Sequence, residues 1–514
     1  MDIGTDKIIQ AMKDRKSICV FWDYDVDGVT SSFLLYTLLS TYFNYKNVKI
    51  MYPDRLADGY GMKVHHVDTI KAAGHDMIIT VDNGITSIQE VLHAKNLWLE
   101  VIITDHHKAL DIIPNADAII NPQVSIDYHF KWICWAGVVL KLTSALLKKS
   151  TISEEIKQSI MNHFIPIVAI ATVADCVPLT GENRAIVRRW LSQMTRRKYI
   201  LPSLAGILDF LNISGPLKSY HIGFIIWPRI NAWWRLATWY DSLKTLLFTW
   251  EKQIWFLNNL DGINDKRKKL QAEALEIAEQ QIDTTKKILI AMDPSFHEWI
   301  VGIVAGKITE KHYKPSVILH ISEKKWLAIG SLRWPDYFDV MEMMQWIQKE
   351  SIGKWWWQDS GILIKFWWHK QAGGMTLKLK DKDLLIQLLN EYCEQHLTTT
   401  NTKKTFTIDT AIHSHERNHT SLEPLQHMEP FGQKNEEPVF ILEKTIIKSV
   451  EKVWSKWKGH LKIWVNHWWK HVDSLYRSKG DTIDNYTIGQ EIDIIGKVKF
   501  DDYKKVHFID GMII

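Results

Sequence analysis

The sequence predicts an α/β protein with a parallel sheet at its N-terminal end, a second strand–helix region and a β-rich C-terminal domain. Over the first 120 residues, short apolar runs alternate with segments long enough for helices. This alternation is typical of a parallel sheet with crossover helices. After residue 405 the apolar runs are short and no long helix separates them, which favours a small barrel or sandwich. At 514 residues the chain is long enough for about three domains.

Five apolar runs predict the strands of the first sheet. They cover residues 17–22, 48–52, 77–81, 100–104 and 117–120. The intervening segments Thr30–Tyr42 and Ser87–Asn96 have the length of helices. In parallel sheets of this kind the ligand lies beyond the carboxyl ends of the strands. The polar residues that follow each run are therefore the candidates for chemistry.

Carboxylates and imidazoles follow four of the apolar runs. They are Asp23, Asp25 and Asp27 after 17–22, Asp82 after 77–81, Asp105, His106 and His107 after 100–104, and Asp175 after a later run, Ile165–Val173. Each segment alone has an ordinary explanation as an acidic turn, an Asp-Asn-Gly turn or a surface histidine pair. Three aspartates within five residues repel one another unless a cation lies among them. Together the four segments favour a metal site, and its oxygen-rich ligands suit Mg or Mn rather than Zn.

Three further regions follow along the chain. Residues 264–283 have helical spacing, which fits a helix that links two halves of the chain and equally a helix packed within one domain. The next region repeats the strand–helix pattern, with Ile288–Ala291, Ile300–Lys311 and Ser316–Ile321. The predicted strands of the C-terminal domain are Thr405–Ile408, Pro438–Leu442, Leu461–Val465, Glu491–Ile495 and Val506–Ile509.

Composition narrows the class of protein. No apolar run approaches the roughly 18 residues of a membrane span, and the first 17 residues lack an apolar signal core. We expect a cytoplasmic protein without a membrane partner. Four scattered cysteines argue against a disulfide scaffold or a zinc site. The net charge is only +4, so any phosphate-binding surface must be a local patch.

Four motifs resemble those of the DHH phosphoesterase superfamily. They are DYDVDG (23–28), VDNG (81–84), TDHH (104–107) and ATVADCVPL (171–179). Further segments resemble the RecJ family of single-strand-specific 5′→3′ exonucleases within this superfamily: WPRINAWWR (227–235), HEWIVGIVAGKI (297–308), GSLR (330–333), WWHKQAGG (367–374) and EPFGQKNEEPVF (429–440). The resemblance runs over nearly the whole chain.

The resemblance implies a domain order and an activity. It implies a DHH domain at 1–195, a connecting region with the linking helix at 196–284, a DHH-associated substrate-binding domain at 285–397 and an OB-like nucleic-acid-binding domain at 398–514. The implied activity is removal of 5′-mononucleotides from single-stranded DNA in recombination and repair, with a helicase and a single-strand-binding protein as expected partners. The alternatives are a phosphodiesterase for oligoribonucleotides or cyclic dinucleotides, and an inactive DHH scaffold in replication. The β-rich domain favours the exonuclease over the oligoribonucleotide or cyclic-dinucleotide phosphodiesterase. The intact ligand residues argue against the inactive scaffold.

The resemblance also assigns roles to residues. Two Mn²⁺ or Mg²⁺ ions would be held by Asp25, Asp27, Asp82, His106 and Asp175, with Asp82 and Asp175 as bridges. Such an ion pair, about 3.5–4 Å apart, can activate a water and stabilise the leaving oxygen of a phosphodiester. Asp23 and Asp105 would be ligands or would orient ligands, and His107 would face the scissile phosphate as a hydrogen-bond donor or general acid. The implied phosphate contacts are Arg229, Asn231, Arg235, Ser331, Arg333 and His369.

Tryptophan is unexpectedly frequent, with 25 residues against 25 glycines. Glycine is thus about 5% of the chain, below the usual level of roughly 7%. Several tryptophans lie where the family pattern has glycine: Trp22, Trp135, Trp190, Trp227, Trp234, Trp299, Trp326, Trp367, Trp368 and Trp454. Some bacteria read UGA as glycine, and a translation that reads it as tryptophan would produce this pattern. The alternative is that the rings are real, as stacking platforms or as marks of an inactive paralogue.

Overall fold

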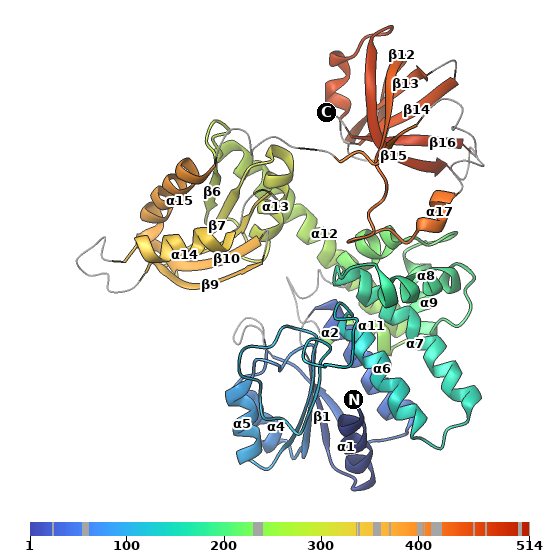
Figure 1. Cartoon of the computed structure of the whole chain (residues 1–514). Coiled ribbons are helices and arrows are strands. Elements are labelled where there is room, and N and C mark those ends of the chain that lie inside the picture. The colour runs from blue at the N-terminus through green and yellow to red at the C-terminus, as the bar shows by residue number, and fades with distance from the viewer. Residues whose placement is uncertain are drawn as a thin grey trace. The chain divides into compact units, whose positions relative to one another are not determined.

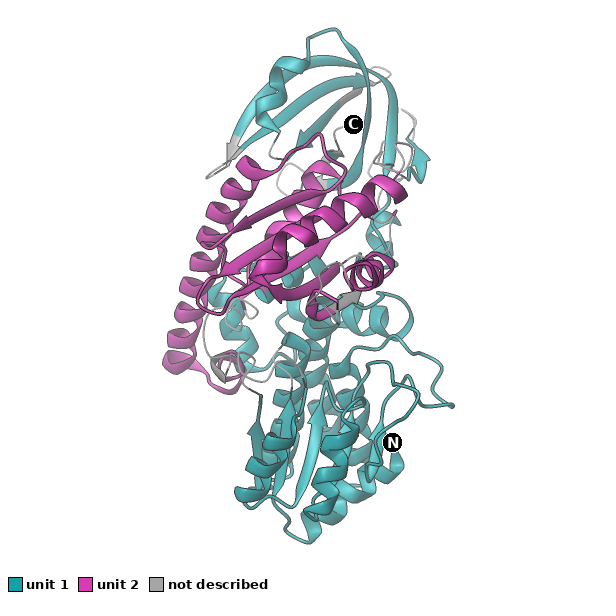
Figure 2. Ribbon diagram, turned by 90° about the vertical axis from the view of Figure 1, so that its left-hand side faces the viewer, with its two compact units in different colours: residues 1–227, 406–514 teal, residues 228–405 magenta. Residues whose placement is uncertain are grey.

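The chain forms two compact units in a computed structural model. One unit contains residues 1–227 and 406–514, and the other contains residues 228–405 (Figure 2). The structure describes residues 1–22, 25–53, 61–229, 240–335, 337, 340–352, 361–369, 372–397, 405, 407–412, 424–455, 458–467, 470–477, 479–501 and 506–512.

The first unit begins with a parallel sheet in the order β2-β1-β3-β4-β5. Its strands are β1 (Ile18–Trp22), β2 (Val48–Met51), β3 (Met77–Val81), β4 (Glu100–Thr104) and β5 (Ala118–Ile120). All five lie at the predicted runs, which confirms the parallel sheet. The strand order reverses between β1 and β3, and ligands bind at such a switch point in open α/β sheets. The chain that follows β1 and β3 carries the predicted aspartates.

Helices cover both faces of this sheet (Figure 1). Those that pack on its strands are α1 (Asp2–Lys13), α2 (Val26–Thr37), which continues as the π-helical η1 (Leu38–Tyr42), α4 (Val64–Ala72) and α5 (Ile88–Asn96). The chain continues with α6 (Trp135–Lys148), α7 (Glu154–Ala174), α8 (Gly181–Thr195), α9 (Pro202–Phe210) and η2 (His221–Ile226). Helices α4 and α5 bury Val67, Ile70, Val91 and Ala94 against one face of the sheet.

The apolar run Ile165–Val173 belongs to α7 and is not a strand. A short run of apolar residues fits a buried strand and a buried helix equally well, because periodicity cannot separate them. By length and composition α7 could cross a membrane, but most of its apolar stretch is buried inside the molecule. It contacts α2, α6 and α8, as a core helix does.

The second unit contains a mixed sheet in the order β6-β7-β8-β10-β9. Its elements are α11 (Tyr240–Leu247), α12 (Trp250–Gln281), β6 (Leu289–Asp293), α13 (Val301–His312), β7 (Ser316–Ser322), β8 (Leu327–Arg333), α14 (Val340–Glu350), β9 (Leu363–His369), β10 (Ala372–Lys378), η3 (Leu379–Asp381) and α15 (Lys382–His396). The predicted helix at 264–283 is the C-terminal part of α12, which begins at Trp250. Ala274 and Ala278 of α12 pack in one core with α13.

The C-terminal part of the first unit is a five-stranded barrel with one further short strand paired to it, as the short predicted strands favoured. Its elements are β11 (Thr410–Ala411), α17 (Pro424–Met428), β12 (Phe440–Ser455), β13 (Lys458–His467), β14 (Lys470–Tyr476), η5 (Gly480–Asn485), β15 (Glu491–Asp501) and β16 (Val506–Met512). Pairing of β12 with β15 closes the sheet. The predicted strand Thr405–Ile408 is wrong in position, because the residues that pair with β12 are Thr410 and Ala411. The strand β14 was not predicted.

The segment before the barrel is fixed to the helices of the first unit. The backbone N–H of Leu179 donates to the Gln433 carbonyl at 2.8 Å. The Ser219 hydroxyl donates to the Phe431 carbonyl at 2.7 Å. The barrel is thereby anchored close to the C-terminal end of α7, where Asp175 lies.

Candidate metal centre

The first aspartate motif forms the start of α2. Asp25 is the N-cap residue, and its side chain accepts a hydrogen bond from the Gly28 N–H at 2.9 Å. Asp27 is buried in the first turn and accepts from the backbone N–H groups of Trp135 at 2.6 Å and Ala136 at 2.8 Å. These donors are the first N–H groups of α6, which suit an anion. Burial nevertheless raises the pKa of Asp27 to about 6, against the opposing effect of His106. Asp23 lies outside the described residues.

Asp82 ends β3 in a strained turn. Its φ is +62°, a conformation that aspartate tolerates better than most residues. The Asn83 side chain donates to the Val81 carbonyl at 2.8 Å, and the Thr80 hydroxyl donates to the Asn83 carbonyl at 2.7 Å. Gly84 has φ +109°, and a Cβ there would lie 2.7 Å from the Thr80 hydroxyl oxygen. The turn that presents Asp82 therefore needs glycine at position 84.

Asp105 positions the histidine pair. One of its oxygens accepts from the Ile85 N–H at 2.9 Å, and the other accepts from the His106 N–H at 2.8 Å and from Nδ1 of His107 at 2.7 Å. Burial would raise the pKa of Asp105, but these hydrogen bonds and the charge of His107 together lower it. Of the two roles left open for Asp105, its bonds favour orienting the histidines over binding metal.

His106 lies at the centre of the cluster. Its Nδ1 is 3.2 Å from the Ile133 carbonyl, which makes Nδ1 the protonated nitrogen and leaves Nε2 as a ligand atom. Nε2 is 3.2 Å from an Asp82 oxygen, and Nδ1 is 3.9 Å from Asp175. Burial alone would lower the pKa of His106, but Asp175, Asp27 and Asp105 outweigh it and raise the pKa.

Asp175 reaches the cluster from the C-terminal end of α7. Its Oδ2 is buried and has no hydrogen-bond partner. Burial raises the pKa of this carboxyl well above its ordinary value, and the charges of Asp27 and Asp25 raise it further. A buried carboxylate of this kind is costly unless a cation neutralises it.

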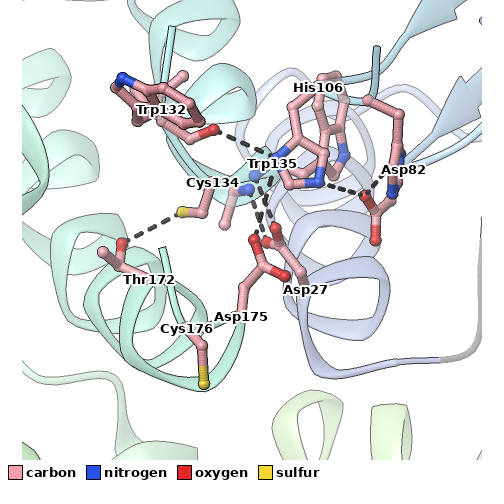
Figure 3. A network of polar contacts seen from close by, with 12 residues as sticks. Asp27, Asp82, His106, Trp132, Cys134, Trp135, Thr172, Asp175 and Cys176 are labelled. Carbon is pink, nitrogen blue, oxygen red and sulfur yellow. Dashed lines mark hydrogen bonds and ion pairs between the residues drawn. The ribbon is translucent and has the colours of Figure 1, made fainter. Parts of the chain in front are cut away.

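Two groups of potential ligand atoms share His106, which Figure 3 shows together with Asp27, Asp82 and Asp175. One contains Asp27, His106 and Asp175, and the other contains Asp82, His106 and His107; within each group the atoms lie within 4.8 Å of one another. Carboxylate oxygens dominate this donor set, which therefore fits Mg²⁺ or Mn²⁺. We call this cluster, with Asp25 and Asp105, the metal edge.

Family models match both the sheet domain and the barrel of this chain. Residues 17–172 match the N-terminal domain of the DHH family, and residues 408–513 match the RecJ OB domain. The single-stranded-DNA-specific exonuclease RecJ of Salmonella typhimurium is 30% identical over 86% of this chain and 77% of its own length. RecJ of Escherichia coli is also 30% identical, over 85% of this chain and 77% of its own length. The chain belongs to the RecJ family.

This chain spans only part of the length of two further RecJ proteins. The Bacillus subtilis RecJ is 30% identical over 98% of this chain, which spans 61% of the length of that relative. The crystal structure of Thermus thermophilus RecJ in complex with Mn²⁺ matches 99% of this chain and 70% of its own, with a TM-score of 0.79 and 22% identity. A manganese-bound exonuclease RecJ matches 78% of this chain with a TM-score of 0.64 and 24% identity. These structures confirm the fold.

The structure brings together seven of the residues that the sequence singled out. They are Asp25, Asp27, Asp82, Asp105, His106, His107 and Asp175. Asn121 was missed, although it follows β5 as the strand-end rule requires; its side chain donates to the His107 carbonyl at 3.0 Å. The N–H groups of Trp135 and Ala136 were also missed, and no sequence signal marks them because every residue but proline has such a donor.

The described residues among the predicted phosphate contacts belong to the second unit. Ser331 and Arg333 are two residues apart in β8 and therefore lie on the same face of the strand. Nη1 of Arg333 donates to the Ser331 hydroxyl at 2.8 Å. Both side chains lie against Gly302 at the start of α13, where a Cβ would be 3.3 Å from Nη2 of Arg333 and from the Ser331 hydroxyl oxygen. Burial lowers the pKa of Arg333. In the described part of the chain no carboxylate forms an ion pair with Arg333. We call Gly302, Ser331 and Arg333 the arginine site.

Of the other four predicted phosphate contacts, Arg229 alone has a side chain that the structure describes. Arg229 forms an ion pair with Asp261 of α12 at 2.8 Å, so part of its guanidinium is already engaged. Asn231 and Arg235 lie outside the described residues. His369 ends β9, paired with Ala372 of β10, and its side chain is not among those described.

A pocket of about 590 Å³ lies in the first unit beside the metal edge. Its wall includes Cys176, which follows Asp175, together with Tyr220, Phe224, Lys218 and Lys499. The rings of Tyr220 and Phe224 are stacked, with centroids 5.0 Å apart. The pocket therefore offers aromatic faces, whereas Lys218 and Lys499 are ion-paired with Glu429 and Glu437 of the same lining.

Proposed function

We propose that the protein is a metal-dependent, single-strand-specific 5′→3′ exodeoxyribonuclease that releases 5′-mononucleotides in recombination and repair. The observation that carries this proposal is the pair of ligand groups that share His106 at the metal edge. The proposal takes its substrate from the relatives, which are single-stranded-DNA-specific exonucleases. The helicase, the single-strand-binding protein and the cytoplasmic location remain predictions.

Five residues would hold two divalent ions. Asp27, Asp82, His106 and Asp175 supply ligand atoms in the two groups, and Asp25 lies close enough for its charge to raise the pKa of Asp27 and Asp175. Mn²⁺ is supported by the Thermus RecJ complex with Mn²⁺, and Mg²⁺ by a complex of the same RecJ. Bound there, such ions lower the pKa of a water and neutralise charge on the phosphate.

His107 is the residue we assign to proton donation. Its Nδ1 is held by Asp105 at 2.7 Å, and the Asn121 side chain holds its backbone carbonyl. The side chain is 46% exposed, so Nε2 remains accessible to a substrate phosphate. Asp105 thereby fixes the orientation of the imidazole ring. Asp105 and Asn121 are positioning residues, because neither reaches the open side of the cluster.

The remaining features support a single-stranded substrate. The arginine site holds a guanidinium that has two hydrogen bonds to neutral groups and suits a phosphate. The barrel matches the RecJ OB domain, and OB folds bind single strands. Exposed, stacked rings such as Tyr220 and Phe224 in the pocket beside the metal edge are typical of the platforms on which bases stack.

A pair of end-labelled oligonucleotides tests the proposal. With Mn²⁺, a single strand labelled at its 5′ end should yield labelled mononucleotide at once, while a 3′-labelled strand should shorten as a ladder. Release of the 3′ label first would overturn the polarity. Activity confined to dinucleotides would favour the oligoribonucleotide or cyclic-dinucleotide enzyme, and binding without hydrolysis would favour the scaffold. Cys176→Ala is a matched control for changes at Asp175, since its side chain adjoins the site but is not in either ligand group.

A further inference from the structure

Three tryptophans have a left-handed backbone, at positions 98, 250 and 326. Their φ values are +60°, +60° and +53°. Large L-residues rarely adopt this conformation, whereas glycine adopts it without a steric cost. In the described residues, 3 of the 13 non-glycine residues with positive φ are tryptophan, whereas tryptophan is 25 of 514 residues in the whole chain. Tryptophan is therefore about five times more frequent at these positions than chance predicts.

Trp98 occupies the glycine position of a helix C-terminus. After α5, the N–H of Trp98 donates to the Lys95 carbonyl and the N–H of Leu99 donates to the Ala94 carbonyl, both at 3.0 Å. These two bonds define a Schellman motif, whose left-handed residue is usually glycine. The end of α4 has the same motif, and there the left-handed residue is Gly74, with φ +78°.

Trp326 occupies the glycine position of a hairpin turn between β7 and β8. Its N–H donates to the Glu323 carbonyl at 3.2 Å, which makes it the fourth residue of a β-turn. Glycine is favoured at this position. Hairpins that end such a turn with a left-handed residue also take glycine there.

Side-chain packing does not explain the three rings. Trp98, Trp250 and Trp326 are 89%, 81% and 75% exposed, so they gain little from burial. Trp98 also lies just before β4 begins at Glu100, at the amino end of the strands. The metal edge lies at the carboxyl ends, so Trp98 cannot serve as a stacking platform beside it.

Two buried tryptophans give independent evidence. The rings of Trp135 in α6 and Trp190 in α8 are fully buried, and neither indole N–H has a hydrogen-bond partner. A buried donor without a partner is costly, because it loses its hydrogen bonds to water and gains none in return. The backbone N–H of Trp135 binds Asp27, and glycine would supply the same donor without the indole.

We propose that glycine occupies positions 98, 135, 190, 250 and 326 in the protein that its own cells make, because UGA codons there are translated as glycine. Trp98 and Trp250 extend the set beyond the positions marked by the family pattern, and they rest on backbone geometry alone. The proposal also predicts a more open metal edge, since one indole beside Asp27 is absent.

The gene and the native protein test the proposal directly. TGA codons are expected at the five positions. Tryptic peptides from the native protein, Asn96–Lys108 and Trp326–Arg333, should each be lighter by the mass difference between tryptophan and glycine. TGG codons, or tryptophan in these peptides, would overturn the proposal. Neither readout depends on nuclease activity, so failure here is separate from failure of the proposed function.

A recombinant series tests the physical basis. Trp98→Gly and Trp326→Gly should each raise the midpoint of thermal unfolding by roughly 2–4 °C. The matched control is Trp255→Gly, an exposed tryptophan within α12, where glycine weakens the helix and should lower the midpoint. If Trp98→Gly and Trp326→Gly lower the midpoint as Trp255→Gly does, the backbone does not require glycine and the physical argument is wrong.

Discussion

The metal edge and the arginine site bury charges of opposite sign. At the metal edge, burial raises the pKa of Asp27 and Asp175. At the arginine site, burial lowers the pKa of Arg333. In each region the charged form is destabilised, and a ligand of the opposite charge would relieve that cost. Burial therefore leaves the metal edge suited to cations and the arginine site suited to an anion.

The two regions differ in how they are built. The metal edge draws on the ends of β1, β3 and β4 and on the end of α7. The arginine site draws on one strand and the first turn of one helix. A change at the metal edge should therefore disturb a shared network, whereas a change at the arginine site should remove one local contact.

Loss of a carboxylate at the metal edge should have the largest effect. Asp175→Asn should reduce nuclease activity by more than the 10–100-fold that is typical of residues behind a metal ligand. The same change should raise the unfolding temperature of the metal-free protein, because it removes a buried charge. Activity and thermal unfolding in EDTA measure the two effects, with Cys176→Ala as the control. A loss of both activity and metal-free stability would mean that the carboxylate is not destabilising.

Asp105→Asn should have the next largest effect. The amide can still accept from the Ile85 N–H, but it no longer supplies the charge beside His107. We expect activity to fall by about 10–100-fold while Mn²⁺ affinity changes little. Calorimetric titration with Mn²⁺ and single-turnover rates separate the two quantities. A large loss of Mn²⁺ affinity would instead make Asp105 a ligand.

Arg333→Ala should have a smaller effect of a different kind. It removes charge-assisted hydrogen bonds, each worth roughly 1.5–3 kcal/mol, from the bound strand. We expect KM to rise by about 10-fold or more with kcat little changed, and Arg333→Lys to restore part of the loss. Steady-state kinetics on a single-stranded oligonucleotide measures the split. A fall in kcat at unchanged KM would break the comparison, because the site would then act in chemistry.

The pH dependence of stability should show the smallest effect. With the pKa of Asp27 near 6 in the folded protein and about 3.9 in the unfolded chain, the folded state holds the extra proton between these values. This group therefore makes the metal-free protein less stable as pH rises from about 4 to 6. The free energy of unfolding by urea in EDTA, measured for the wild type and for Asp27→Asn at each pH, gives the contribution of Asp27. Saturating Mn²⁺ should remove this pH dependence, because a bound cation keeps Asp27 ionised, and an unchanged pH dependence would mean that Asp27 binds no metal.

The site residues that could be predicted from the sequence are those whose position follows from the sheet. Asp82 and His106 could be placed because each follows an apolar strand, and parallel strands end at one edge. The rule would also have given Asn121. Helix α7 was missed because Ile165–Val173 is apolar on all sides. Such a run shows no helical spacing of apolar residues that would distinguish it from a strand. The N–H donors of Trp135 and Ala136 could not be found, because a backbone contact between distant segments leaves no trace in residue type.

The order in which the chain is synthesised separates the two walls of the pocket beside the metal edge. The wall that contains Cys176 and Tyr220 is made early, and the wall that contains Lys499 follows only after the whole second unit, residues 228–405. A nascent chain on the ribosome can thus complete the metal edge well before the pocket exists. The metal ligands are therefore in place before the barrel supplies the last residues of the pocket.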